Sequence, residues 1–154
     1  MADISITIPD DFKKELQQFG NNIAKNIAIT AREELSAEYI RAVDMFYSAY
    51  SPQKYKRHYT LYNSFTKFYR NPHGNRVRGG IEISANGMAE VHHDSSSTVL
   101  DTALIGYHGR PKLGIVTSPS IIDHIMRYRD LLYANIDAYA DGAISGASGN
   151  GQYF

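Results

Sequence analysis

The chain has 154 residues, no cysteine, and sixteen basic against sixteen acidic residues. The absence of cysteine excludes disulfides, thiolate metal sites and cysteine nucleophiles, and the length favours one domain with its own core. The start of the chain lacks the pattern of a secretory signal, and no apolar run reaches the ~20 residues needed to span a bilayer. We therefore expect a soluble protein with no membrane partner.

The first fifty residues predict a short strand, a short helix and a long helix. Isoleucines alternate within Asp3–Ile8, which is typical of a strand. Pro9 then opens a helix to about Phe19, and Gly20-Asn21-Asn22 is expected to interrupt it. The long helix follows, from Ile23 to about Tyr50, and Pro52 ends it. Its apolar stripe comprises Ile23, Ile27, Ala31, Leu35, Tyr39, Ala42, Phe46 and Tyr50, whereas Lys25, Arg32, Glu33, Ser36 and Arg41 lie off the stripe.

The middle of the chain predicts a small antiparallel sheet. Phe65–Arg70 is expected to be a strand, and the turn residues at 71–75 join it to a second strand at Arg76–Ser84. In that second strand Val77, Gly79, Ile81 and Ile83 share one face, and Arg76, Arg78, Gly80 and Glu82 share the other. Asn86-Gly87 predicts a hairpin turn that returns through Met88–His93.

The last third predicts two more helices and a tail. A short helix follows the serines at 95–97 and ends at Gly106, and a loop covers Tyr107–Val116. Ser120 and Asp123 have capping-box spacing at the start of the last helix, whose apolar positions include Ile122, Ile125, Leu132, Ile136 and Tyr139. The class is therefore α+β: a long amphipathic helix packed on a small twisted antiparallel sheet, with a C-terminal helix. Residues 1–141 form the single domain, and the glycine-rich residues 142–154 form a flexible tail.

No set of residues predicts catalysis or a bound cofactor. His92-His93-Asp94 resembles a metal-ligand cluster, but neighbouring side chains on a strand point to opposite faces. Ser95-Ser96-Ser97 lacks the glycines of a nucleophile elbow, and the glycines elsewhere match neither a phosphate loop nor a dinucleotide motif. We expect no enzyme, metal or cofactor; a small hydrolase that uses His92, His93 and Asp94 would have to retain a metal.

Positive charge is concentrated in one segment. Residues 51–80 contain seven Lys or Arg and no acid, so the other 124 residues hold nine basic and sixteen acidic residues, a balance of −7. Tyr55, Tyr59, Tyr62 and Tyr69 are interspersed with these cations. Cations with aromatic rings suit nucleic acid, and Tyr and Arg are also enriched in protein interfaces. Tyr59, Leu61, Tyr62 and Phe65 could alternatively pack the core between helix and sheet.

The order of elements resembles a known family. A long helix leads into Ser51-Pro52-x-x-Tyr55-x-Arg57-x-Tyr59-x-Leu61-x-Asn63-Ser64, followed by a hairpin, a Gly106-Tyr107-His108-Gly109 loop and a helix opened by Ser118-Pro119-Ser120. Over residues 22–140 this resembles the neck or tail-completion proteins of long-tailed bacteriophages. Many members have Thr-Gly where this chain has His58-Tyr59-Thr60.

The resemblance implies a structural virion protein, assembled in the host cytoplasm, that forms a ring in the head–tail connector. Its partners would be further copies of itself, in a ring of about six or twelve subunits, and the neighbouring connector and tail proteins. The contact surface, between subunits or towards DNA in the channel, is expected to use Lys54, Lys56, Arg57, Tyr59, Lys67, Arg70, Arg76 and Arg78. The hairpin tip at 72–75 is a second candidate, and Tyr153 and Phe154 are expected to dock on a neighbouring subunit.

The alternative function is a nucleic-acid-binding module that uses the same basic segment, 51–80, as a monomer or dimer. The two functions differ in their response to salt. Nucleic-acid binding weakens steeply as salt rises, because each neutralised phosphate releases counterions. A ring held mainly by apolar and tyrosine contacts is less sensitive.

Overall fold

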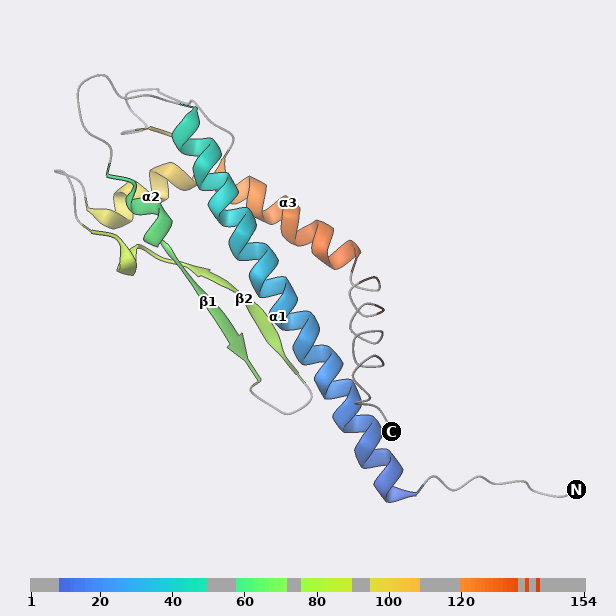
Figure 1. Cartoon of the computed structure of the whole chain (residues 1–154). Coiled ribbons are helices and arrows are strands. Elements are labelled where there is room, and N and C mark those ends of the chain that lie inside the picture. The colour runs from blue at the N-terminus through green and yellow to red at the C-terminus, as the bar shows by residue number, and fades with distance from the viewer. Residues whose placement is uncertain are drawn as a thin grey trace, which may run out of the picture.

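The computed structural model describes residues 9–49, 58–71, 76–89, 95–108, 120–135, 138 and 141. The elements in chain order are α1 (Asp10–Ser48), the 3₁₀ turn η1 (Thr60–Asn63), β1 (Phe65–Arg70), β2 (Arg78–Ile83), the 3₁₀ turn η2 (Ala85–Gly87), α2 (Ser96–Leu104) and α3 (Ile121–Ala134). Helix α1 forms the long axis, the β1–β2 sheet lies along one side of it, and α3 lies along another (Figure 1). The predicted α+β class is confirmed. The predicted strand at Asp3–Ile8 and the tail at 142–154 lie outside the described residues.

Helix α1 is one uninterrupted helix of 39 residues, so the predicted break at Gly20-Asn21-Asn22 is wrong. Glycine in a helix costs about 1 kcal/mol relative to alanine, which is too little by itself to end a helix of this length. A Cβ atom placed on Gly20 would meet nothing within 4 Å, so no packing requirement explains this glycine. The N-terminal part of α1 projects beyond the end of the sheet (Figure 1).

The two strands pair in the predicted antiparallel hairpin. Phe65 lies opposite Ile83 and Arg70 lies opposite Arg78, which fixes the register across all six pairs. The face that holds Gly79, Ile81 and Ile83 is directed at α1, as expected from their alternation. A Cβ atom on Gly79 would lie 2.0 Å from the carbonyl oxygen of Ala28, so this glycine lets the backbones of strand and helix touch.

The predicted return strand after Asn86-Gly87 is wrong over the residues that the structure describes. Ala85–Gly87 forms the turn η2, with the Ser84 hydroxyl accepting a hydrogen bond from the Asn86 amide at 3.1 Å. Met88 is buried in the core rather than paired in the sheet. Local hydrogen bonding by serine therefore outcompetes the hairpin preference of Asn-Gly. Residues 90–94, with His92, His93 and Asp94, lie outside the described residues.

Helix α3 begins at the predicted Ser120 cap, whereas α2 begins within the serines at 95–97 rather than after them. The Ser95 hydroxyl accepts a hydrogen bond from the Thr98 amide at the start of α2. Beyond the other end of α2, Gly106 has a φ of 88°, a left-handed value that glycine adopts readily. The Ser120 hydroxyl accepts from the Asp123 amide at 3.2 Å and also donates to the carbonyl of Leu104 at 2.8 Å. Ser120 thus caps α3 and ties it to the end of α2. On α3 the buried positions are Ile121 and Ile125.

The core lies where α1, η1, α2 and α3 meet. Its buried members include Tyr39, Val43, Leu61 and Ile121, each no more than 2% exposed. Ser36, expected off the apolar stripe, is buried as well, and its hydroxyl donates to the Glu33 carbonyl at 2.8 Å. A serine can occupy this position because the preceding helical turn satisfies its donor.

A buried polar contact joins α1 to the start of β1. The Ser64 hydroxyl donates to the Leu61 carbonyl at 2.6 Å, and it lies 2.6 Å from the Tyr39 hydroxyl. Because the serine hydroxyl has one proton and donates it to the Leu61 carbonyl, the Tyr39 hydroxyl is the donor to Ser64. Burial raises the pKa of Tyr39, which keeps the phenol protonated as this role requires.

Tyr39→Phe is expected to destabilise the fold by about 1–2 kcal/mol, because the Ser64 hydroxyl would lose its donor inside the core. Urea denaturation followed by circular dichroism measures the change. Tyr133→Phe, at a tyrosine of α3 that is 67% exposed, is the matched control and should stay within about 0.5 kcal/mol of the parent. Equal stabilities for the two variants would show that this hydrogen bond contributes nothing to folding.

Candidate functional site

The best-defined candidate surface is one face of the β1–β2 sheet, opposite to the face on which Gly79 meets Ala28 of α1. The register places Thr66, Phe68 and Arg70 of β1 on it, opposite Glu82, Gly80 and Arg78 of β2. Phe68 lies across Gly80, where a Cβ atom would come within 3.3 Å of the ring. Leu35 of α1 also reaches this position, 3.9 Å from the same Cβ atom, and Gly80 is buried. The face is exposed at its other positions, Thr66, Arg70, Arg78 and Glu82, and we call it the outer sheet face.

Two arginines stand directly opposite each other on the outer sheet face. Arg70 and Arg78 are a cross-strand pair, a position where like charges destabilise a sheet. The Arg70 guanidinium lies 4.9 Å from the centre of the Phe68 ring and 3.5 Å from the Glu82 carboxylate. Arg70 and Glu82 are each 61% exposed, so their ion pair is weak. The face thus concentrates two cations beside an aromatic ring, with one acid near them.

Lys67, expected at a contact surface, instead pairs within the chain. Its side chain points to the α1 side of the sheet, where its ammonium lies 2.5 Å from a carboxylate oxygen of Glu33. The Arg32 guanidinium lies 2.7 Å from the other oxygen. Lys67 first, and then Arg32, holds the pKa of Glu33 below its ordinary value of 4.5. Glu33 is therefore ionised at neutral pH, and Lys67 fastens β1 to α1.

Lys67→Met is expected to move the pKa of Glu33 back towards 4.5, because the largest cause of its lowering is removed. The pair contributes stability above the ordinary pKa, and this contribution disappears as pH falls through the lowered value. Carboxyl resonances followed by NMR across an acid titration measure the shift. Lys25→Met on the exposed side of α1 is the control, and an unchanged pKa in Lys67→Met would contradict the pairing.

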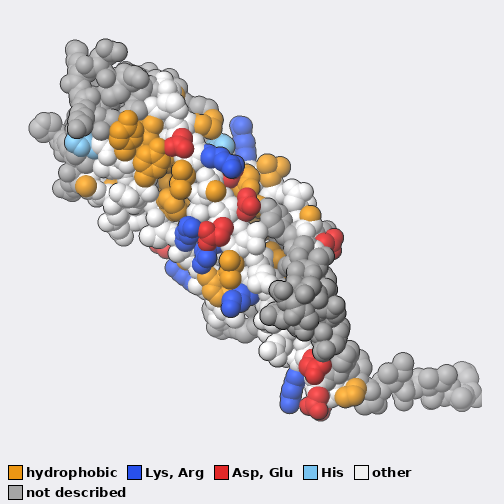
Figure 2. All heavy atoms as spheres, viewed as in Figure 1, with side chains coloured by type: hydrophobic (Ala, Val, Ile, Leu, Met, Phe, Trp, Pro, Cys, Tyr) orange, Lys and Arg blue, Asp and Glu red, His pale blue; other side chains and the backbone are white. Residues whose placement is uncertain are grey.

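Tyr59 belongs to a tyrosine cluster at the C-terminal end of α1. Its backbone is left-handed, with φ of 56°, and its side chain is 52% exposed. The Tyr47 ring meets it edge-on at 5.0 Å, and Tyr62 lies 5.5 Å from Tyr47. Burial, and then the hydrogen bond donated to Asp44, raises the pKa of Tyr62 to about 12. Figure 2 shows hydrophobic side chains gathered alongside this half of α1.

No protein-family model, curated protein or solved structure matches this chain. The site therefore has to be judged on its own geometry. Of the predicted contact residues, Arg70 and Arg78 share the outer sheet face, and Arg76 is exposed just before β2. Tyr59 and Lys67 lie elsewhere, at the tyrosine cluster and against α1. Lys54, Lys56, Arg57, Tyr153, Phe154 and the hairpin tip at 72–75 lie outside the described residues.

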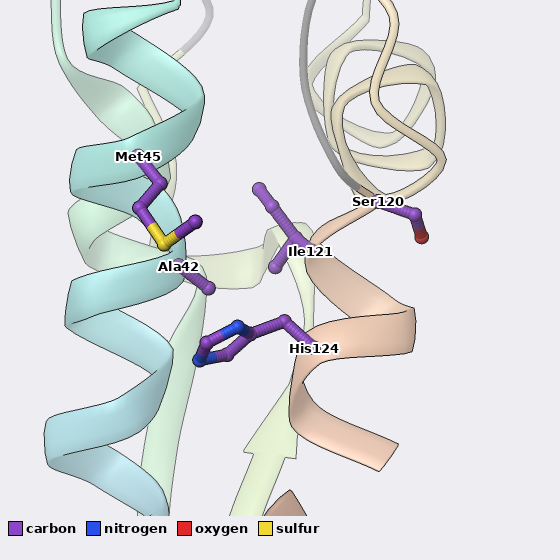
Figure 3. Close-up of a pocket in the computed structure, with 5 residues that line it drawn as sticks. All are labelled: Ala42, Met45, Ser120, Ile121 and His124. Carbon is purple, nitrogen blue, oxygen red and sulfur yellow. The ribbon is translucent and has the colours of Figure 1, made fainter. Parts of the chain in front are cut away.

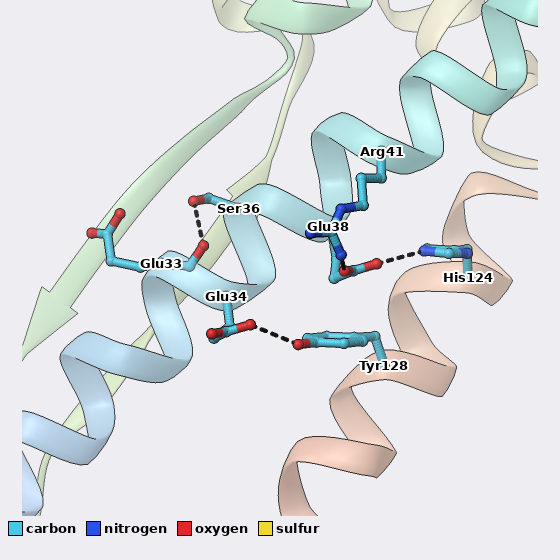
Figure 4. A network of polar contacts seen from close by, with 7 residues as sticks. All are labelled: Glu33, Glu34, Ser36, Glu38, Arg41, His124 and Tyr128. Atoms are coloured by element: carbon cyan, nitrogen blue, oxygen red, sulfur yellow. Dashed lines mark hydrogen bonds and ion pairs between the residues drawn. The ribbon is translucent and has the colours of Figure 1, made fainter. Parts of the chain in front are cut away.

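Sequence reasoning missed a polar seam between α1 and α3, drawn in Figure 4. Glu34 accepts a hydrogen bond from the Tyr128 hydroxyl at 2.7 Å, and Glu38 lies 3.0 Å from the His124 ring nitrogen. Arg41 also pairs with Glu38, whose side chain is only 8% exposed. The signal was present as two four-residue spacings, 34–38 and 124–128, that face each other on antiparallel helices. This seam orients α3 on α1.

The hollow drawn in Figure 3 is small. Ala42, Met45, Ser120, Ile121 and His124 line it, between α1 and α3, and it has room for about one water molecule. Ligand pockets are far larger, typically at least ~300 Å³. No group of three or more metal-ligating side chains occurs in the part of the chain that the structure describes. Within the same residues, no helix is long and apolar enough to cross a membrane.

Proposed function

We propose that the protein is a structural subunit of a phage head–tail connector, which assembles with copies of itself into a ring around the DNA channel and works in the virion. The observation that carries the proposal is the opposed pair Arg70 and Arg78 on the outer sheet face. A like-charge pair across two strands is unfavourable in the isolated subunit. An anionic partner, such as an acidic surface of the next subunit, offsets it, and complementary charge gives such contacts their register.

Exposed apolar side chains support the same proposal. Helix α3 presents Met126, Leu131 and Tyr133 to solvent, and α1 presents Ile40 and Met45, each at least 40% exposed. Methionine and tyrosine are enriched in protein interfaces, so these positions suit contacts with neighbouring subunits. A subunit that packs against neighbours on two sides needs surfaces of this kind.

The nucleic-acid-binding module is the second candidate, and one observation favours it. Arg70 and Arg78 stand side by side at one end of the outer sheet face, and the Arg70 guanidinium lies 4.9 Å from the centre of the Phe68 ring. Arginines that contact phosphates, beside an aromatic ring, are a combination that proteins use to bind nucleic acid. The ring proposal includes DNA as a contact in the channel, so the two candidates differ in whether assembly requires DNA.

The deciding experiment is the native mass of the purified protein at moderate and at high salt, with and without duplex DNA. The ring proposal expects a discrete closed oligomer of about six or twelve subunits without DNA. A monomer that becomes heavier only with DNA, and releases it at high salt, would support the nucleic-acid-binding module instead. A monomer under all four conditions would contradict a self-assembling ring.

A further inference from the structure

We propose that the Asp3–Ile8 segment of one copy adds as a third strand to the free edge of β1 in a neighbouring copy. The inference deepens the proposed ring and rests on self-association of the chain. Among the described residues β2 is the only strand paired with β1, so the backbone donors and acceptors on the other edge of β1 have no strand partner there. Such an edge is a ready template for another extended segment.

The Asp3–Ile8 segment fits that edge in length and pattern. It has six residues, as β1 does, and its isoleucines alternate with Asp3, Ser5 and Thr7. In an antiparallel arrangement with residue 8 opposite residue 65, every position of the two segments is paired. The isoleucines then share the α1-facing side of the sheet with Phe65 and Tyr69.

The polar residues of the segment fit the outer sheet face in the same register. Thr7 comes opposite Thr66, and Asp3 comes opposite Arg70. The carboxylate of Asp3 therefore stands next to the arginine pair, where Glu82 is the one acid among the described residues of the sheet. A parallel arrangement with residue 3 opposite residue 65 would instead direct Asp3 at the α1 side and the isoleucines at the arginines, so the charge pattern selects the antiparallel one.

Helix α1 has an exposed apolar residue on the side that faces β1. Glu33 contacts Lys67 of β1, and Asp44 contacts Tyr62 just before β1, so this row of α1 faces the β1 side. Ile40 lies between them on the same row and is 41% exposed. Isoleucines added on the α1 side of the sheet would cover part of this flank, which Figure 2 shows as hydrophobic surface.

The segment cannot reach the edge of its own sheet. Phe65 packs against Tyr39, 29 residues along α1 from Asp10, which is ~44 Å at 1.5 Å per residue. Ile8 is two residues from Asp10 and can extend only ~7 Å from it. The other end of the sheet is also too far, because Gly79 touches Ala28, ~27 Å along the helix from Asp10. The added strand must therefore come from another copy.

This geometry suits a ring. Each copy would donate its Asp3–Ile8 segment to one neighbour and accept a segment from the other. Such a head-to-tail contact forms a closed ring when the rotation between neighbouring copies is a whole fraction of a full turn. The projecting N-terminal half of α1 (Figure 1) sets the separation between donor and acceptor bodies. The outer sheet face would then be completed only in the assembly.

The test uses the absence of cysteine in the natural chain. Thr7→Cys and Thr66→Cys are purified separately, one of them enlarged by a tag, then mixed and oxidised. Directly opposite residues of antiparallel strands lie within disulfide distance, so a disulfide between the two sizes is expected. Ile6→Cys mixed with Thr66→Cys is the matched control. Its side chain points to the other face, and the yield should fall at least tenfold.

A charge exchange tests the register independently. Asp3→Arg is expected to raise the concentration at half-assembly at least tenfold, because it adds a third cation beside Arg70. Combining it with Arg70→Asp should restore assembly to within about threefold of the parent, since the pair is re-formed with its charges reversed. Failure of the double variant to recover, together with no 7–66 disulfide, would overturn the strand addition.

Deletion of residues 1–8 separates this inference from the ring. A closed oligomer that survives the deletion and yields no 7–66 disulfide keeps the ring and rejects the strand addition. A 7–66 disulfide in a particle of only two copies supports the strand addition and rejects the ring. A monomer that yields no disulfide at any concentration rejects both.

Discussion

Gly79→Ala should destabilise the protein by about 3 kcal/mol or more, whereas Gly20→Ala should stabilise it by about 1 kcal/mol. The chemical change is the same, one methyl group, and the surroundings decide its sign. At position 79 the new carbon would lie 2.0 Å from the Ala28 carbonyl oxygen, which is backbone and cannot rotate away. At position 20 the carbon enters open space on a helix, where alanine is the better helix former.

Urea denaturation of the parent and both variants, at a protein concentration where all three are monomeric, measures the difference. The slope of the unfolding free energy against urea should stay constant, so that midpoints can be compared. Equal losses at both positions would mean that helix α1 and β2 do not touch as described. A loss at Gly20 alone would mean that the helix is interrupted there after all.

The elements predicted best from the sequence are those whose signals are local. Phe65–Arg70 matches β1 end for end, the Ser120 cap starts α3, and α2 starts within the serines at 95–97, because alternation and capping depend on residues within one turn or strand. The Gly20 interruption failed because its weak local penalty competes with a 39-residue helix. At Asn86-Gly87 the described residues form η2 instead of a hairpin turn, because the Ser84 hydroxyl accepts from the Asn86 amide and Gly87 lies against the Asn63 backbone. Sequence spacing cannot reveal the second of these contacts.

The candidate site was predictable in one respect only. Alternation along β2 correctly placed Arg78 on the face opposite to Gly79 and Ile81, but it gave no register with β1 and so no indication that Arg70 stands opposite. Lys67 pairs with Glu33, which is 34 residues earlier in the chain, and Glu38 and His124 are separated by 86 residues. Contacts of this range follow from tertiary packing, which periodicity does not encode.

Arg78→Glu is expected to make the isolated subunit more stable and the assembly weaker. The substitution places a carboxylate directly opposite Arg70, which replaces a cross-strand repulsion by an attraction worth about 0.2–1 kcal/mol. The same carboxylate occupies Arg70 and repels an anionic partner, so the concentration at half-assembly should rise at least tenfold. Urea denaturation of the monomer measures the first effect, and native mass across a dilution series measures the second.

Lys25→Glu on the exposed side of α1 changes the net charge equally and is the matched control, expected to alter neither quantity appreciably. A gain in stability together with a loss of assembly is expected of a residue that destabilises the isolated subunit but is needed to bind a partner. If Arg78→Glu destabilised the monomer, the arginines would already be offset within the chain, and the main support for an anionic partner would disappear. If it stabilised the monomer, left assembly intact and abolished binding of DNA, the outer sheet face would belong to the channel rather than to the contact between subunits.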